Sequence, residues 1–242
     1  MNTKWGLFGR AGAPASERRA RDEDMQRLVE PELLDSLPFD DAEALRIRRE
    51  LGTINALMGN HRWLARQARK RLPRPSRGLE LGAGAGRLMR RFRSGRMPCA
   101  LDGLDLCPAP TDMEPGQRWF QRDLLRFVGY AAYDAVFGCL IFHQFSDDEL
   151  AMLGARMSES VDFIFACEPA RRRRHLWQLR MVSRLGRMGQ ITRSDGITSV
   201  RAGFLGEELP RSLGLRCDTW RWDCSVGWRG QYRMAAWKIH LS

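Results

Sequence analysis

The fold of this chain is decided by the stretch Gly78-Leu79-Glu80-Leu81-Gly82-Ala83-Gly84-Ala85-Gly86-Arg87. A short apolar run with an acidic residue near its end leads directly into alternating glycines, which is typical of a buried strand followed by a tight turn. Glycine has no Cβ and tolerates positive φ, so the backbone of such a turn can lie close to a ligand. The stretch therefore predicts a strand and a ligand-binding glycine turn.

Two common nucleotide-binding motifs do not fit this turn. The dinucleotide fingerprint Gly-x-Gly-x-x-Gly needs a third glycine where this chain has Arg87 in one register and Met89 in the other. The phosphate loop of nucleoside triphosphatases is excluded as well, because no Gly-Lys-Ser/Thr follows the glycines. The turn therefore belongs to neither of these classes.

Outward from the turn, short apolar runs alternate with turns and helices, as in a parallel sheet. Ser146 and Glu149 predict a capping box that opens one of these helices, and 207–213 predicts the last helix. The final two runs predict an antiparallel hairpin, because only a short turn joins them. Strands are expected at 78–81, 100–104, 118–120, 133–142, 161–167, 215–226 and 231–240.

The residues before the sheet predict a helical arm. Residues 1–20 lack periodicity and are expected to be flexible, whereas 21–75 have a helical pattern. Asp40 with Glu43 predicts a helix cap, and Gly59-Asn60 interrupts the helix. The arm is expected to pack on the domain behind it, and the alternative is that it also covers a pocket as a lid. The apolar face of its first helix is expected to contain Ile47, Leu51, Ile54 and Met58.

Acidic residues follow the next two predicted strands. Asp105 lies 19 residues beyond Gly86, where a carboxylate can accept both hydroxyls of a ribose, and Asp123 follows the third strand, where it could accept from an adenine amino group. With these three elements in order, residues 76–168 resemble the class I S-adenosylmethionine-dependent methyltransferases, and the terminal hairpin resembles theirs loosely.

This resemblance implies a fold and a cofactor site. The fold is a Rossmann-like α/β domain over 76–242, with a seven-stranded, mostly parallel sheet, an antiparallel terminal hairpin, an insertion at 170–200 and the N-terminal helical extension. The cofactor is S-adenosylmethionine. The residues implied to bind it are Glu80, Gly82, Ala83, Gly84, Gly86, Asp105, Leu106, Asp123, Leu124 and Cys139.

The end of the fourth strand points to a subfamily. The segment 133–145 is similar to the fourth strand of methyltransferases of ubiquinone and menaquinone biosynthesis, with His143 matching the first histidine of a His-His pair and Gln144 departing from the second. The resemblance makes His143 a candidate base, since the usual histidine pKa near 6.5 leaves a neutral imidazole at pH 7. The alternative is that His143 only shapes the pocket.

Residues 168–205 resemble the insertion of bacterial natural-product methyltransferases, which covers the acceptor. Arginines 171–174 are followed by an apolar helical stripe from Trp177 to Met188. The stripe is expected to pack on the core, and the alternative is weak contact with a membrane surface. An acceptor pocket is expected between His143, residues 55–63 and this insertion. Its apolar cover is expected to contain Met58, Trp63, Trp177, Met181 and Met188.

Composition narrows the functional classes. The formal charge is +11, but 40 basic residues include only three lysines, and such an arginine bias is not by itself evidence of a nucleic-acid surface. The six cysteines form no Cys-x-x-Cys pair, so reduced thiols and no metal are expected. The longest apolar run, 135–142, is far below the roughly 20 residues of a membrane span. We therefore expect a cytoplasmic protein.

The expected function is methyl transfer to an oxygen or carbon of a small aromatic or polyketide-like molecule. No nucleic-acid partner is expected. An RNA methyltransferase is the first alternative, although the Asp/Asn-Pro-Pro-Tyr/Phe segment for amino-group methylation is absent. A non-catalytic, methyltransferase-like partner protein is the second alternative. The sequence does not indicate the oligomeric state.

Overall fold

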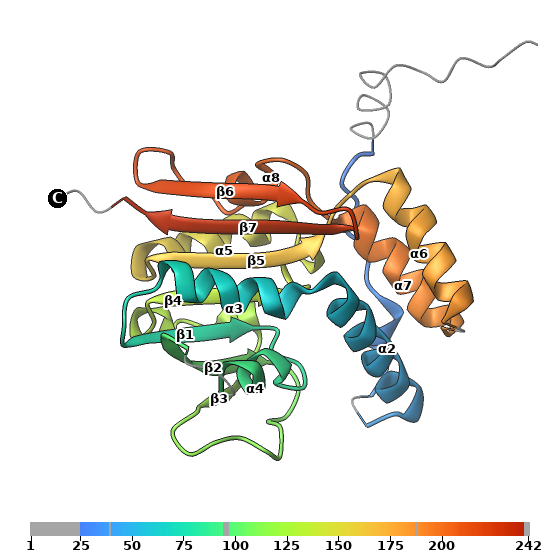
Figure 1. Cartoon of the computed structure of the whole chain (residues 1–242), viewed down its shortest axis with the longest axis horizontal. Helices are drawn as coiled ribbons and strands as arrows, with labels where there is room; N and C mark the ends of the chain where they lie inside the picture. Colours follow the sequence, from blue (N-terminus) through green and yellow to red (C-terminus); the bar gives the residue numbers. More distant parts are fainter. Residues whose placement is uncertain (1–24, 39, 94–96, 187, 240–242) are drawn as a thin grey trace, which may run out of the picture.

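A seven-stranded sheet forms the centre of the computed structural model, which describes residues 25–38, 40–93, 97–186 and 188–239 (Figure 1). The strand order is β3-β2-β1-β4-β5-β7-β6, in which β1 to β5 are parallel and β7 is antiparallel to both neighbours. The expected fold class is confirmed, and the expected flexible residues 1–20 lie outside the described ranges. The strands are β1 (Ser76–Leu81), β2 (Cys99–Asp105), β3 (Trp119–Gln121), β4 (Ala135–Cys139), β5 (Phe163–Pro169), β6 (Trp220–Val226) and β7 (Gln231–Lys238).

Helices cover both faces of the sheet. On one face lie α3 (Asn60–Arg71) and α4 (Arg87–Arg93), and on the other lie α5 (Asp147–Ser160) and α8 (Glu208–Ser212). Successive strand residues point to opposite faces, so Val136 of β4 packs into one buried cluster and Phe137 into the other. The expected capping box of Ser146 and Glu149 opens α5, as the sequence predicted.

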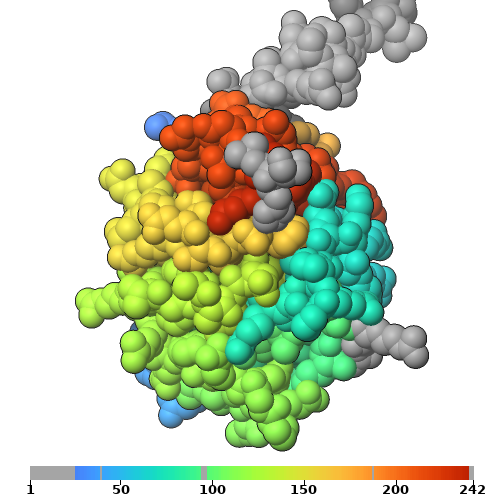
Figure 2. Space-filling model, turned by 90° about the vertical axis from the view of Figure 1, so that its left-hand side faces the viewer, coloured from blue at the N-terminus to red at the C-terminus, as the bar shows by residue number. Residues whose placement is uncertain are grey.

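A third group of helices lies beyond the carboxyl ends of the parallel strands. It consists of α2 (Ala42–Met58), α6 (Arg173–Leu185) and α7 (Gln190–Ala202), with the short helix η1 (Leu33–Ser36) packed on α7 (Figure 1). The opposite end of the sheet, which faces the viewer in Figure 2, is covered by α3, the α5–β5 connection and the ends of β6 and β7. Within the described ranges, no helix is long and apolar enough to cross a membrane.

The expected helical arm over 21–75 is present only in part, because residues 25–32 form no helix, η1 is a short 3-10 helix, and the first α-helix begins at Ala42. The N-cap of α2 is Asp41, whose carboxylate accepts from the backbone N–H groups of Glu43 and Ala44, and the expected cap Asp40 does not have this role. Gly59, with φ +69°, separates α2 from α3 as expected. The arm therefore consists of two helices, of which α3 packs on the sheet and α2 lies at its carboxyl end.

Three other expected boundaries were wrong. The fourth strand ends at Cys139 instead of Phe142, because Leu140 has φ +60° and the chain then enters η4 (Phe142–Gln144). Strand β6 begins at Trp220, five residues after the expected start at Leu215. Helix α6 ends at Leu185, so Met188 lies outside the expected stripe. Two more short helices, η2 (Leu124–Arg126) and η3 (Gly129–Ala132), connect β3 to β4.

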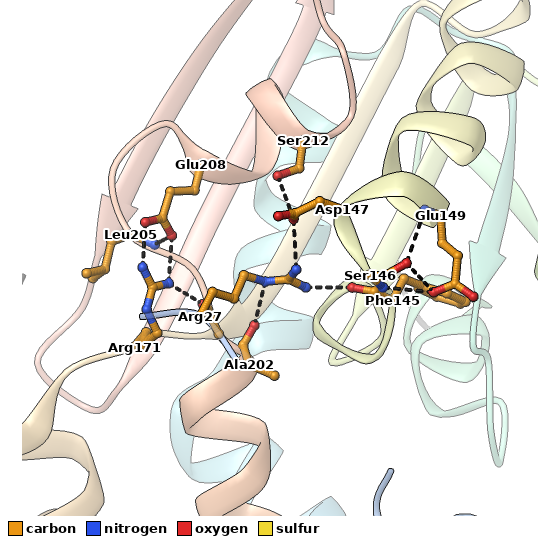
Figure 3. A network of polar contacts seen from close by, with 11 residues as sticks. Arg27, Phe145, Ser146, Asp147, Glu149, Arg171, Ala202, Leu205, Glu208 and Ser212 are labelled. Carbon is orange, nitrogen blue, oxygen red and sulfur yellow. Dashed lines mark hydrogen bonds and ion pairs between the residues drawn. The ribbon is translucent and has the colours of Figure 1, made fainter. Parts of the chain in front are cut away.

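Two arginines tie the segment before α2 to the domain (Figure 3). Arg27 donates to the carbonyl oxygens of Ala202 and Phe145 at 3.0 and 2.7 Å, and to Asp147 at 2.9 Å. Arg171 binds the Glu208 carboxylate through both terminal nitrogens, at 2.8 and 2.5 Å, and donates to the carbonyl oxygen of Met25 at 2.6 Å. These contacts hold the segment from residue 25 against α5, α7 and Arg171 of the β5–α6 connection, which is itself bound to α8 through Glu208.

Candidate functional site

The glycine turn has the conformation that the sequence predicted. Gly82, Gly84 and Gly86 have φ values of +62°, +52° and +69°, which side chains rarely permit. A Cβ at Gly82 would lie 2.7 Å from the side chain of Ile141, whereas one at Gly84 would meet nothing within 4 Å. The backbone at Gly84 therefore borders open space at the carboxyl ends of β1 and β2.

Asp105 is held beside this turn. One carboxylate oxygen accepts from the Gly84 N–H at 2.7 Å, and the other accepts from the Cys107 N–H at 2.8 Å. The side chain is half-buried, and each oxygen keeps a lone pair for a further donor. The carboxylate is thus oriented by the backbone to accept a pair of hydroxyl groups.

Asp123 lies at the same edge of the sheet. Asp105 pairs with Gln121 across β2 and β3, and Asp123 follows two residues later, where it caps η2 through the Leu125 N–H at 2.9 Å. The side chain of Leu106 is 69% exposed next to Asp105, whereas that of Leu124 is buried in the core. Asp105, Leu106 and Asp123 therefore offer two carboxylates and an apolar surface, while the Leu124 side chain supports them from below.

Glu80 lies beneath the turn. Its side chain is buried at the end of β1, and one carboxylate oxygen has no hydrogen-bond partner. Burial raises the pKa of Glu80, and the nearby Asp105 charge adds to this, although a hydrogen bond with the Met89 backbone opposes both. Glu80 thus connects β1 to the start of α4, and Gly82 to Gly86 cross above it.

Helix α2 meets the end of β4 through a small polar cluster. Asn55 Nδ2 lies 3.0 Å from His61 Nε2 and 3.4 Å from Cys139 Sγ. Burial, with the charges of Arg87 and Arg91, lowers the pKa of His61 to about 4, so this imidazole is neutral at pH 7. His61 was not identified from the sequence, because only the fold brings α3 to the glycine turn.

His143 occupies a different environment from the one expected. Its ring is buried in η4, with Nδ1 2.7 Å from Glu168 Oε2 and Nε2 3.4 Å from Glu32 Oε1. Burial alone would lower the pKa of His143, but the hydrogen bonds and charges of Glu168 and Glu32 outweigh it and raise the pKa to about 9. The structure therefore does not provide the neutral imidazole that a general base needs at pH 7. The role of His143 in shaping the pocket stays a prediction.

Glu168 organises the end of β4. The fully buried carboxylate accepts from the backbone N–H groups of Ile141, Phe142 and His143 at 3.1, 3.0 and 3.3 Å, in addition to the His143 ring. These bonds turn the chain out of β4 into η4. The sequence did not indicate this role for Glu168, and Glu32 carries no local signal, since it lies 111 residues from His143.

The His143 contacts predict a pH dependence of stability. Its pKa is higher in the folded chain, at about 9, than the usual value near 6.5. The resulting stabilisation, about 3 kcal/mol, is complete below pH 6.5 and is lost as the pH rises through 9. We expect urea unfolding of the wild type to show this loss between pH 6.5 and 9.5 and the His143→Gln variant to lack it. If the free energy of unfolding of the two proteins changed with pH in the same way, His143 would not be stabilised by Glu168 and Glu32.

A cavity of about 580 Å³ opens beside the end of β4. It lies where the acceptor pocket was expected, between His143, α2 and the 170–200 insertion. Trp63 and Met188 do not line it, and Trp63 lies instead under the Arg233 guanidinium at 5.6 Å. The apolar part of its lining contains Leu34, Leu51, Ile54, Leu57, Met58, Leu140, Pro169, Trp177, Leu179, Met181, Val182, Val200 and Trp228.

The polar end of this cavity is formed by Glu32 and His143, which also line an adjoining cavity of about 390 Å³ together with Asp35. Burial and the charges of Glu32 and Asp195 raise the pKa of Asp35. In the part of the chain that the structure describes, no group of three or more His, Cys, Asp or Glu side chains is placed to hold a metal ion. The carboxyl edge of the sheet thus carries a glycine turn with two carboxylates at the ends of β1 to β3, and an apolar cavity beside the ends of β4 and β5.

Known structures share this fold. The plantazolicin methyltransferase BpumL, solved with SAH and a triazolic desmethylPZN analog, is 10% identical at a TM-score of 0.64, over 84% of this chain and 93% of that one. The plantazolicin methyltransferase BamL is 13% identical at 0.60, over 83% and 92%. A possible exported protein from Bordetella parapertussis is 11% identical at 0.51, over 81% and 69%. No protein-family model and no curated protein matches the sequence. These likenesses confirm the expected Rossmann-like fold.

Proposed function

We propose that this chain is an S-adenosylmethionine-dependent methyltransferase that acts on a small apolar acceptor. The observation that carries the proposal is the position of Asp105 against the Gly84 N–H, at the edge of the sheet where Asp123 and the apolar cavity also lie. In open α/β sheets, ligands bind in the crevice at the carboxyl ends of the strands. The methyltransferase fold of BpumL and BamL, both solved with SAH, supports the same cofactor.

The residues at this edge fit the cofactor. The glycine turn leaves the space that a Cβ at Gly84 would fill, and Asp105 is oriented to accept the two ribose hydroxyls. Leu106 offers an apolar surface to the adenine ring, and Asp123 an acceptor to its amino group. When bound, S-adenosylmethionine supplies an electrophilic methyl group on a sulfonium sulfur. Other proposed contacts are the backbone of Gly82, Ala83 and Gly86 and the side chain of Cys139.

The cavity holds the acceptor next to this edge. Its apolar walls on α2, α6 and α7 exclude water and orient the acceptor, which is how positioning accelerates a transfer between two bound molecules. Because His143 is held between two carboxylates with a pKa of about 9, its proposed role is to position η4 at the cavity floor. The proposed nucleophile is therefore an oxygen or carbon that ionises without His143 acting as its base, as in an acidic phenol or enol of an aromatic or polyketide-like molecule.

The Asp105→Ala variant tests the cofactor site. Removing the carboxylate is expected to cost about 1–3 kcal/mol, the range for hydrogen bonds to a charged group, so S-adenosylmethionine affinity is expected to fall by roughly 5- to 150-fold. Isothermal titration calorimetry measures this change. The matched control is Asp218→Ala, which removes an exposed carboxylate in the α8–β6 connection and should leave the affinity unchanged. If wild type and Asp105→Ala bound S-adenosylmethionine with equal affinity, Asp105 would not be the residue that binds the ribose hydroxyls.

A further inference from the structure

Helix α6 lies at the outer end of the molecule, on the right in Figure 1, and several of its apolar side chains are exposed. Trp177 is 62% exposed and Leu185 80%, and Trp228 in the β6–β7 turn is 70% exposed. We define the rim patch as Leu57, Trp177, Met181, Val182, Leu185 and Trp228, each of which is at least 38% exposed. Large apolar side chains exposed together mark a surface that binds something, because single soluble domains rarely leave them uncovered.

The rim patch lies at the opening of the cavity of about 580 Å³. All of its members except Leu185 line that cavity, so the patch is the rim of an apolar opening. Gln178 donates to the carbonyl oxygen of Trp228 at 3.1 Å, and Arg229 donates to that of Leu57 at 2.7 Å. These bonds join α6, the β6–β7 turn and the end of α2 around the opening.

The charge around the rim patch is positive. Between Glu168 and Asp195 the sequence has eight arginines and no acidic residue. Of these, Arg173, Arg174, Arg180 and Arg184 are exposed on α6, and Arg229 adds another exposed arginine from the β6–β7 turn. Tryptophan and leucine beside arginines on one amphipathic helix form a surface that is complementary to anionic lipid headgroups and the acyl chains beneath them.

We propose that the rim patch docks on the surface of an anionic lipid bilayer, so that the cavity opens toward the membrane and receives a lipophilic acceptor from it. The docking rests on the rim patch alone, and the delivery of an acceptor rests on the proposed function. A bilayer fits better than a nucleic acid. The patch combines aliphatic and indole side chains around an apolar opening, whereas a nucleic-acid strand would need a continuous basic groove to follow its backbone.

Flotation with lipid vesicles tests the docking. The full chain is expected to float with phosphatidylglycerol-containing vesicles and not with pure phosphatidylcholine. The double variant Trp177→Ser/Trp228→Ser is expected to bind at least about tenfold more weakly, because it removes two indoles that insert at the interface. The double variant Arg180→Gln/Arg184→Gln is expected to lose about tenfold or more at low salt, since each arginine near an anionic surface contributes to binding.

Two matched control variants show whether vesicle binding depends on the rim patch or on exposed apolar and basic side chains in general. Val128→Ser/Met152→Ser removes exposed apolar side chains away from the rim patch, and Arg66→Gln/Arg69→Gln removes exposed arginines from α3. Both should bind vesicles like wild type. Absence of vesicle binding, equal binding by all variants, or a tryptophan-dependent affinity for RNA in place of lipid would overturn the proposal. Vesicle binding by a chain that does not bind S-adenosylmethionine would support the docking surface and contradict only the proposed function.

Discussion

The Glu168→Ala variant is expected to unfold with about 3–5 kcal/mol less free energy than wild type at pH 7, because it leaves a buried charge without its partner. Glu168 is fully buried, and it lies 2.7 Å from the His143 ring while it accepts from three backbone N–H groups of the β4–η4 turn. With the carboxylate removed, His143 must lose its proton or remain charged with only Glu32 at 3.4 Å.

Urea unfolding at pH 7 measures this loss. Glu168→Gln should have an intermediate effect, since an amide oxygen can still accept from the backbone. The control is Glu207→Ala, which breaks an exposed ion pair with Arg211 and should cost less than about 1 kcal/mol. If Glu168→Ala costs no more than this control, then the carboxylate does not hold the end of β4.

The Gly84→Val variant is expected to bind S-adenosylmethionine at least about 100-fold more weakly, through two effects on the turn. Gly84 has φ +52°, which costs a β-branched residue roughly 1–2 kcal/mol or more, and the valine side chain would occupy the open space that we assign to the cofactor. Gly84 also donates the N–H that orients Asp105.

Gly214→Val separates these two effects. Gly214 has φ +65° and open space around its Cβ position, but it lies in the connection to β6, away from the glycine turn. Calorimetry should find normal S-adenosylmethionine affinity in this variant despite a comparable loss of stability. If both variants lost affinity equally, backbone strain would account for the result and the position of Gly84 would not.

The sequence predicted the fold because its signals are local. Glycines 82, 84 and 86, the capping box of Ser146 and the interruption at Gly59 each act through their own backbone, and the structure confirms all three. The predicted end of β4 was wrong because the sequence shows only such local signals. Residues 135–142 are uniformly apolar, and the chain leaves the sheet because Leu140 takes φ +60° and the distant Glu168 binds the following N–H groups.

The part of the site that lies at the ends of neighbouring parallel strands was predictable from the sequence. Asp105 and Asp123 lie at the expected edge, because neighbouring parallel strands place their carboxyl ends together. The environment of His143 was not predictable, since the carboxylates that raise its pKa come from residues 32 and 168. The exposure of Trp177 could not be inferred either, because an apolar helical stripe looks the same whether it faces a core or solvent.

Calorimetric titration of the unmodified chain with S-adenosylmethionine and with S-adenosylhomocysteine tests the central claim most directly. The glycine turn, Asp105 and Asp123 at one edge of the sheet predict saturable binding of both compounds at one site per chain, with Kd in the micromolar range, roughly −7 to −8 kcal/mol. Binding of neither compound below about 1 mM, a free energy weaker than about −4 kcal/mol, would contradict the assignment of this sheet edge as a cofactor site.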